Sequence, residues 1–102
     1  MNAVIVQYTV KNEFVETNKA NIRQVMSDLD ALNDPNIKYS AFLLDDGKSF
    51  VHFVMRVDED AQKTLSDLPS FQEFQQQLRA SEPEELPQAE NLSLVGLSWD
   101  IF

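Results

Sequence analysis

His52 and Arg56 are the two side chains whose types and spacing best fit a chemical role. They lie four residues apart in a segment, Ser49 to Val57, whose β-branched and aromatic residues predict a strand. Residues four apart in a strand point to the same face. A neutral imidazole there can act as a general base or orient a carbonyl, and a guanidinium can hold a carboxylate or an enolate. The pair therefore predicts a small-molecule site on one face of a sheet.

Each candidate also has an ordinary structural role. His52 can be a buried, hydrogen-bonded core residue, and Arg56 can pair with an acidic side chain at the rim of the sheet. Gln7, in the first predicted strand, is a further candidate for the same cavity. Trp99 and Phe102 indicate packing at an interface rather than a platform for a substrate. We take His52 as the catalytic candidate, and Arg56 and Gln7 as substrate-binding candidates.

The composition excludes several other kinds of site. The 102-residue chain has no cysteine and one histidine, which rules out thiolate metal centres, cysteine nucleophiles and sites that need two imidazoles. Asp58-Glu59-Asp60 lacks the glycine and the closing glutamate of a calcium-binding loop, and instead predicts a negatively charged helix start. We predict no metal and no cofactor.

The charge balance excludes further classes of partner. The chain has 17 acidic and 8 basic residues, with a net charge of -9, and its basic residues are scattered singly. Nucleic acids and anionic membranes require a basic cluster. There is no basic leader at the N-terminus, and no window approaches the ~20 apolar residues of a membrane span. We expect a soluble, cytoplasmic protein that binds neither nucleic acid nor membrane.

Changes in hydrophobic period along the chain predict the elements that position the candidates. Alternation marks strands, and apolar residues at spacings of three and four mark helices. The predicted elements are a strand at 3–10, a helix over 12–33, strands at 37–45 and 49–57, two helical segments meeting at Pro69, and a last strand at 92–102. This order is that of the ferredoxin-like βαββαβ arrangement, an α+β fold with a four-stranded antiparallel sheet, here as one domain over 1–102. The acidic segment 81–91 is predicted to be a solvated connector.

Local signals set the ends of the predicted helices. Asn12 is the expected N-cap of the first helix. Pro69 suits only a first helical turn, and Ser70 with Glu73 fits a capping box. The apolar stripe of the second helical region is predicted to be core: Leu65, Leu68, Phe71, Phe74 and Leu78.

The turn between the second and third strands decides which side chains share a face. A two-residue turn at Asp46-Gly47 pairs Phe42 with Val51, whereas a three-residue turn with a left-handed Gly47 pairs Phe42 with Phe50. Only the second register gathers apolar residues of both strands on one face of the sheet, so we predict it. It leaves one plain core face and one mixed face: Lys38, Ser40, Phe42, Leu44, Phe50, His52, Val54 and Arg56.

Both faces of the first three predicted strands are largely apolar. An antiparallel sheet with one face in water normally alternates apolar and polar residues. A large exposed apolar patch marks an interface, and a two-fold axis lets one patch cover itself. We therefore predict a homodimer that packs through the mixed faces.

Several short segments over roughly residues 3–96 form a recognisable ensemble. They are Val10-Lys11, the helical stretch 18–23, 39–44, Asp46-Gly47, 49–52, 68–74 and Leu94-Val95-Gly96. This ensemble resembles the dimeric α+β barrel superfamily and, within it, small relatives of antibiotic-biosynthesis monooxygenases. The resemblance implies that two ferredoxin-like subunits pack sheet to sheet into a barrel.

The resemblance also implies a range of activities. Members of the superfamily oxidise aromatic polyketides without metal or flavin, degrade haem or isomerise lactones. The haem-degrading members use an Asn, Trp and His set, which Trp99 in the predicted last strand does not match, so that site is not carried over.

Two functions from different classes are compatible with these features. One is a cofactor-independent, monooxygenase-like or isomerase-like enzyme that acts on a small aromatic or enolisable molecule. The other is a non-catalytic homodimer that binds a small metabolite or serves as an accessory domain. The sequence contains no nucleophile–base pair, metal cluster or phosphate loop that would decide between them.

Overall fold

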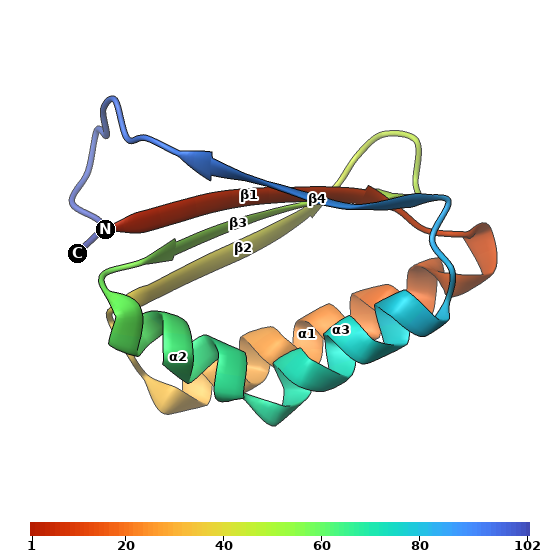
Figure 1. Cartoon of the computed structure of the whole chain (residues 1–102), viewed down its shortest axis with the longest axis horizontal. Coiled ribbons are helices and arrows are strands. Elements are labelled where there is room, and N and C mark those ends of the chain that lie inside the picture. The colour runs from red at the N-terminus through yellow and green to blue at the C-terminus, as the bar shows by residue number, and fades with distance from the viewer.

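The computed structural model describes residues 1–102 as a four-stranded sheet with helices on one face (Figure 1). The elements are β1 Asn2–Thr9, a 3-10 turn η1 Asn12–Phe14, α1 Val15–Leu32, β2 Ile37–Leu43, β3 Ser49–Arg56, α2 Glu59–Asp67, α3 Pro69–Ala80 and β4 Glu85–Leu92. The strand order is β2-β3-β1-β4, with every neighbouring pair antiparallel. The predicted ferredoxin-like α+β fold is confirmed.

The ends of α1 differ in how well the sequence predicted them. No side chain caps its N-terminus, because the 3-10 turn that contains Asn12 leads directly into the helix. The expected Asn12 cap is therefore wrong. At the other end, Asn33 adopts a left-handed conformation with φ 51°, which asparagine tolerates better than most residues. The predicted end near residues 33–35 is confirmed.

The two later helices begin at different kinds of N-terminus. Asp58 caps α2 by accepting a hydrogen bond from the backbone N–H of Ala61 at 2.9 Å, which confirms the acidic helix start. Pro69 occupies the first turn of α3, also as predicted. The predicted capping box is wrong, because Leu68 stands at the N-cap and Ser70 lies inside the first turn. The hydroxyl of Ser70 is buried and has no hydrogen-bond partner.

The pairing of β2 with β3 differs from the predicted register. The backbone N–H of Leu44 donates to the carbonyl of Ser49 at 2.8 Å, which leaves a four-residue loop at 45–48. Phe42 consequently pairs with Val51 rather than with Phe50. The predicted register is therefore wrong, although its left-handed Gly47, with φ 77°, is present.

The side chain of Asp46 explains the longer loop. Its carboxylate accepts hydrogen bonds from the backbone N–H groups of Lys48 and Ser49 at 3.0 and 2.8 Å, and from the Ser49 hydroxyl at 2.5 Å. These contacts, the Ser49 hydroxyl first, hold the pKa of Asp46 below its usual range. An Asp side chain that bonds its own backbone makes a loop of this length favourable.

The observed register re-sorts the side chains of the sheet. The face covered by the helices carries Val4, Val6, Tyr8, Tyr39, Ala41, Phe50, His52, Val54 and Arg56. The open face carries Ile5, Gln7, Lys38, Ser40, Phe42, Val51, Phe53 and Met55. The predicted mixed face does not exist, because His52 and Phe42 lie on opposite sides of the sheet.

The last strand lies earlier in the chain than predicted. β4 spans Glu85–Leu92, almost wholly within the segment 81–91 expected to be a connector, whereas most of 92–102 is irregular, so both predictions are wrong. Every residue of β4 is exposed, so no apolar alternation marks it as a strand. A register shift between Gln7 and Thr9 of β1 accommodates Pro87, as a bulge in an edge strand can.

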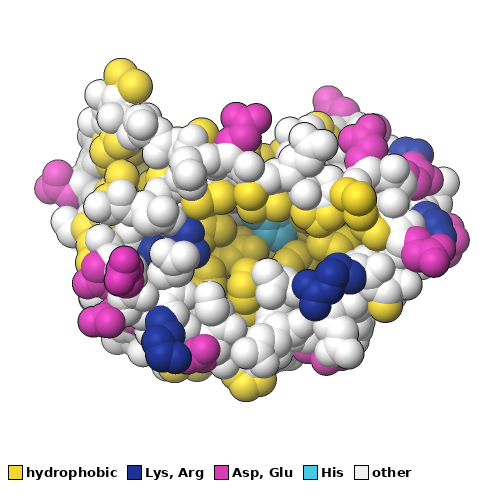
Figure 2. Space-filling view, viewed as in Figure 1, with side chains coloured by type: hydrophobic (Ala, Val, Ile, Leu, Met, Phe, Trp, Pro, Cys, Tyr) yellow, Lys and Arg dark blue, Asp and Glu magenta, His cyan; other side chains and the backbone are white.

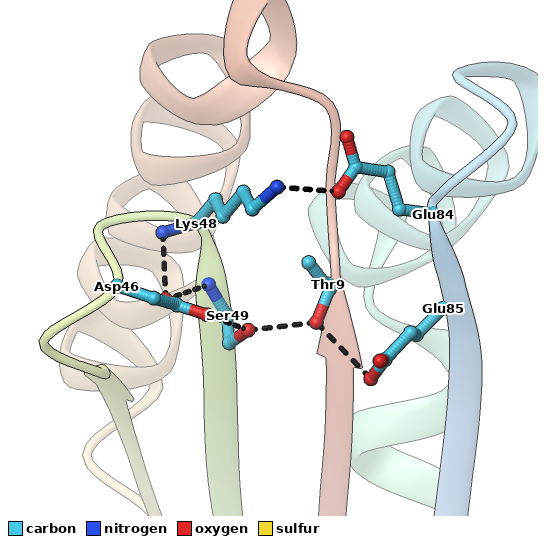
Figure 3. A network of polar contacts seen from close by, with 6 residues as sticks. All are labelled: Thr9, Asp46, Lys48, Ser49, Glu84 and Glu85. Atoms are coloured by element: carbon cyan, nitrogen blue, oxygen red, sulfur yellow. Dashed lines mark hydrogen bonds and ion pairs between the residues drawn. The ribbon is translucent and has the colours of Figure 1, made fainter.

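A network of polar contacts ties the start of β4 to the rest of the sheet (Figure 3). The hydroxyl of Thr9 lies 2.7 Å from the Ser49 hydroxyl and donates to the Glu85 carboxylate at 3.3 Å. Next to it, the Lys48 ammonium and the Glu84 carboxylate form an ion pair at 2.7 Å. The network therefore connects β1, β3 and β4 at one end of the sheet.

Two hydrophobic clusters lie between the sheet and the helices. The first consists of Tyr8, Val10, Val25, Phe50, Phe74 and Leu78, and the second of Ile37, Val54, Ala61 and Leu65. The predicted apolar stripe of the second helical region is core: Leu65, Phe74 and Leu78 are buried, and Leu68 and Phe71 pack against the clusters. None of the helices combines the length and hydrophobicity that crossing a bilayer requires.

Candidate functional site

A cavity of about 490 Å³ lies between the covered face of the sheet and α3. Figure 2 shows it as a hollow lined by hydrophobic side chains, with histidine at its floor and basic side chains beside it. Val6 and Val54 contribute to the floor, and Phe71, Phe74 and Leu78 of α3 form a wall. These α3 residues recur at spacings of three and four, so one helix face presents all of them. The volume is that of an ordinary small-molecule site.

His52 lies at the floor of this cavity, with both ring nitrogens engaged. It is 2% exposed. Its Nε2 lies 2.8 Å from the Tyr8 hydroxyl, and its Nδ1 lies 2.7 Å from the Tyr39 hydroxyl. The ring stacks on Phe74 with centroids 5.5 Å apart. Burial lowers the pKa of His52 to about 4, so the imidazole is neutral near pH 7.

Asn18 gives this chain of hydrogen bonds a direction. Its side-chain amide N–H donates to the Tyr8 hydroxyl oxygen at 2.9 Å. We assign the Tyr8 hydrogen to Nε2 of His52, so that the proton of the neutral imidazole lies on Nδ1. That N–H donates to the oxygen of Tyr39. We call these four residues the relay: Asn18, Tyr8, His52 and Tyr39.

In this assignment the relay ends at Tyr39, whose hydroxyl hydrogen is left without an acceptor within the chain. Tyr39 is half-buried and borders the cavity. Burial, chiefly, raises the pKa of Tyr39 above its ordinary value, so the phenol stays protonated. The arrangement therefore offers a hydrogen-bond donor to any oxygen atom that a ligand places beside Tyr39.

Arg56 lies on the same face of the sheet as His52, as the sequence predicts. Its guanidinium donates a hydrogen bond to the side-chain oxygen of Asn2. Burial lowers the pKa of Arg56, although the group remains a cation. Arg79, on the last turn of α3, also borders the cavity and is exposed.

Gln7 does not join these residues. It is exposed on the open face, where it borders a groove with Ile5 and the glutamates of β4. The expectation that it lines the cavity of His52 is therefore wrong. The cause is the strand period: Gln7 is one residue from Val6 and Tyr8, and neighbours in a strand point to opposite faces.

The open side of the sheet has a larger groove, of about 820 Å³, at the edge formed by β2. Phe42 and Phe53 border it, and Trp99 and Ile101 of the C-terminal segment reach it. No hydrogen-bond network comparable to the relay lies there. We therefore place the candidate site in the smaller cavity.

Three members of the relay were not identified from the sequence. Asn18 carries a detectable signal, because it shares the apolar stripe of α1 with Ile22, Val25 and Leu29. A polar residue on such a stripe requires a partner in the core. Tyr8 and Tyr39 fall on the face of His52 only in the observed strand register.

The described side chains include no group of three or more His, Asp and Glu residues arranged to share a metal ion.

Comparisons with known proteins show what this geometry resembles. No protein-family model matches the sequence, and no curated protein matches it significantly. An antibiotic biosynthesis monooxygenase structure superposes with a TM-score of 0.74 at 16% identity, covering 94% of this chain and 100% of the other. Rv0793 from Mycobacterium tuberculosis gives 0.78 at 14% identity, covering 96% and 98%. SnoaB, a cofactor-independent oxygenase from Streptomyces nogalater, gives 0.71 at 14% identity, covering 97% of each chain.

These likenesses extend over nearly the whole chain. The protein has the fold of the antibiotic-biosynthesis-monooxygenase structures, as the resemblance in its sequence implies. At identities of 14 to 16%, the comparison speaks for the fold alone.

Proposed function

We propose that the cavity binds a small aromatic or enolisable molecule and promotes its oxygenation by O2 without a cofactor. The observation that carries this proposal is the relay, which ends at the Tyr39 hydroxyl beside a largely hydrophobic cavity of about 490 Å³. The likeness to SnoaB, a cofactor-independent oxygenase, supports the reaction type.

In this proposal Tyr39 is the residue that meets the reacting group. A CH2 group that is conjugated with a carbonyl through aromatic rings loses a proton to a water molecule at the mouth of the cavity more readily when the carbonyl oxygen receives a strong hydrogen bond. The Tyr39 hydroxyl donates that bond and stabilises the resulting enolate. The enolate carbon then reacts with O2, so that the CH2 group becomes C=O and the second oxygen atom leaves as water.

His52 acts through Tyr39, and Arg56 holds the anionic form of the ligand. The Nδ1–H of His52 fixes the Tyr39 oxygen, so that the remaining Tyr39 hydrogen faces the cavity. The hydrophobic walls exclude water, which strengthens both interactions.

Oxygen uptake tests the reaction directly. We expect the protein, in the presence of a chelator and without added flavin, to consume O2 with anthrone-like or quinol substrates. Tyr39→Phe removes one hydroxyl and lowers turnover by about 10²- to 10³-fold, the usual effect of deleting an oxyanion donor. Gln7→Ala, on the opposite face, is the matched control and leaves turnover unchanged. Equal rates for Tyr39→Phe and the unmodified protein would contradict the proposal.

One observation favours a second function, the binding of a small molecule without turnover. Both nitrogens of His52 are occupied by tyrosines and its pKa lies near 4, so it offers no free base. Calorimetry distinguishes the two functions: ligand binding at the cavity, with no oxygen uptake across the substrate screen, supports the binding protein.

We also propose that the protein is a homodimer that packs through the open face of the sheet. Phe42 is 57% exposed there, beside Phe53, with ring centroids 6.0 Å apart. One chain exposes 6613 Å². A monomer of 11.7 kDa typically exposes about 5,900 Å². The difference is close to the ~800 Å² that each partner contributes to a standard interface. Light scattering is expected to report twice the mass of the chain.

A further inference from the structure

The cavity is electropositive in a chain that is otherwise acidic. Arg56 and Arg79 border it, and none of the side chains that line it is a carboxylate. The chain as a whole has 17 acidic residues against 8 basic ones. All four ion pairs of the chain use lysines, so neither arginine of the cavity is neutralised by an acidic partner.

The guanidinium of Arg56 has hydrogen-bond partners for only part of its N–H groups. Its one hydrogen-bond partner is the neutral amide of Asn2. Its Nε atom is buried and has no partner. Removing a cation from water without a counter-charge or a full set of hydrogen bonds is unfavourable. An anion that enters the cavity supplies both.

Arg56 and the end of the relay lie close together on the sheet. Arg56 pairs with Ile37 at the start of β2, and Tyr39 follows two residues later on the same face. The charge of Arg56 also acts on the phenol of Tyr39. A ligand on this floor therefore meets a guanidinium and a hydroxyl donor as neighbours.

The aromatic side chains of the cavity wall favour a planar, aromatic ligand. Phe71 and Phe74 lie 6.0 Å apart between ring centroids, and Tyr39 meets Phe71 edge to face at 6.2 Å. Aromatic side chains at such spacings pack well against the rings of a planar ligand. Arg79, exposed at the cavity, adds a second positive charge that attracts anions from solution.

From this geometry we infer that the ligand is an aromatic carboxylate with a hydroxyl or carbonyl group beside the acid. The carboxylate lies at Arg56, the neighbouring oxygen at the Tyr39 hydroxyl, and the rings against the wall that Phe71 and Phe74 form. This inference rests on the proposed function for the location of the site, and it adds the chemical class of the ligand.

A matched pair of probes tests the charge requirement. We propose titration calorimetry with 1-hydroxy-2-naphthoate and with its neutral primary amide, 1-hydroxy-2-naphthamide. The carboxylate is expected to bind about 10- to 100-fold more tightly than the amide, since one side of the hydrogen bonds carries a charge that the amide lacks. Equal affinities, or no binding of the carboxylate at millimolar concentration, would overturn the inference.

Two arginine variants assign the effect to its residue. Arg56→Met keeps the length of the side chain without its charge, and is expected to reduce the preference for the carboxylate to less than about 3-fold. Arg23→Met removes an arginine of α1 that is outside the cavity and likewise forms no ion pair, and it is expected to retain the preference. An unchanged preference in Arg56→Met would overturn the inference. If that variant does not fold, the comparison of acid with amide in the unmodified protein still decides.

Oxygen uptake with the anthrone-like and quinol substrates separates this inference from the proposed function. Selective binding of the carboxylate, with no oxygen uptake from any of those substrates, supports the inference and contradicts the oxygenase. Turnover of neutral aromatic molecules with no preference for the acid supports the oxygenase and contradicts the inference.

Discussion

On the covered face of the sheet, Tyr8, Phe50 and His52 are each at most 3% exposed, whereas Phe42 on the open face is 57% exposed. The side chains of both faces come from the same strands and are largely apolar. They differ in their polar groups. On the covered face these bond to one another through the relay, while on the open face Gln7, Lys38 and Ser40 have no side-chain hydrogen-bond partner within the chain.

This difference separates two roles of an apolar surface. The covered face is completed by the chain itself and leaves one cavity, which the Tyr39 hydroxyl and two arginines border. The open face presents apolar area without any internal polar partner, which is typical of a surface that another protein surface covers. The site and the proposed dimer contact are therefore on opposite sides of one sheet, about one strand thickness apart.

The largest expected effects come from introducing a charge on either face of the sheet. On the covered face the charge should lower stability, and on the open face it should separate the dimer. Val54 is 7% exposed and packs in the second core cluster. Val54→Asp places a carboxylate in this hydrophobic cluster, and is expected to lower the free energy of unfolding by about 3 kcal/mol. Phe53→Asp, one residue earlier, points to the open face and is expected to give a folded monomer.

Circular dichroism and light scattering measure these two outcomes together. A Phe53→Asp protein that remains a dimer would count against the open face as the contact surface. A Val54→Asp protein that keeps its melting temperature would count against the observed strand register.

Acid is expected to lower the free energy of unfolding, because His52 on the covered face is protonated more readily in the unfolded chain. Its pKa is 6.5 when exposed and about 4 in the folded protein, so the unfolded chain binds the extra proton more readily. The contribution of the neutral imidazole is complete above pH 6.5 and is lost as the pH falls towards 4. We expect a loss of about 2 kcal/mol between pH 6.5 and pH 5, and about 3 kcal/mol in total.

Denaturant titrations at several pH values measure this loss. The groups that face His52 are Tyr8, Tyr39 and the nearby Arg56, and none of them changes its charge between pH 6.5 and 5. In His52→Gln the decrease in the free energy of unfolding between pH 6.5 and pH 5 should disappear. An equal decrease in the variant and in the unmodified protein would assign it to other groups.

Two Tyr→Phe variants compare how much the buried start and the half-buried end of the relay contribute to stability. Tyr8 is 1% exposed and bonds both Asn18 and His52, so Tyr8→Phe leaves two buried polar groups without a partner. The expected cost is about 1 to 3 kcal/mol, or a melting temperature lower by roughly 5 to 15 °C. Tyr39→Phe removes one half-buried contact and should cost about 1 kcal/mol or less.

Thermal melts of the two variants, with Ser40→Ala on the open face as control, test this order. Ser40→Ala should stay within about 0.5 kcal/mol of the unmodified protein. A larger loss for Tyr39→Phe than for Tyr8→Phe would contradict this ranking by burial and by number of hydrogen bonds.

The sequence predicted those parts of the fold that hydrophobic period controls. β1, α1, the broken second helical region and the βαββαβ order all follow from spacings that one buried face imposes. β4 escaped prediction because all its side chains are exposed, while the apolar alternation of residues 95–101 lies in an irregular segment. Its position is set by pairing with β1 and by the contacts of Thr9 and Glu85, which no local pattern reveals.

The candidate site was predicted in part. His52 and Arg56 share a face of the sheet because strand period guarantees it within one strand. Which residues of β2 join them depends on the loop at 45–48, and the carboxylate of Asp46 determines its length. The predicted pairing of β2 with β3 is shifted by one residue from the observed one. It places Tyr39 on the face opposite to His52, so the sequence did not identify Tyr39 as a partner of His52.

The exposed strand β4 has a consequence for how copies of the chain meet. The outer edge of a sheet is a template on which further strands can stack, the first step towards fibrils. β4 carries Glu85 and Glu90, and its backbone is interrupted by Pro87, which has no N–H to donate. Carboxylates on incoming copies repel one another at this border. Strand addition is thereby disfavoured on that side, which leaves the open face of the sheet as the surface for the proposed dimer.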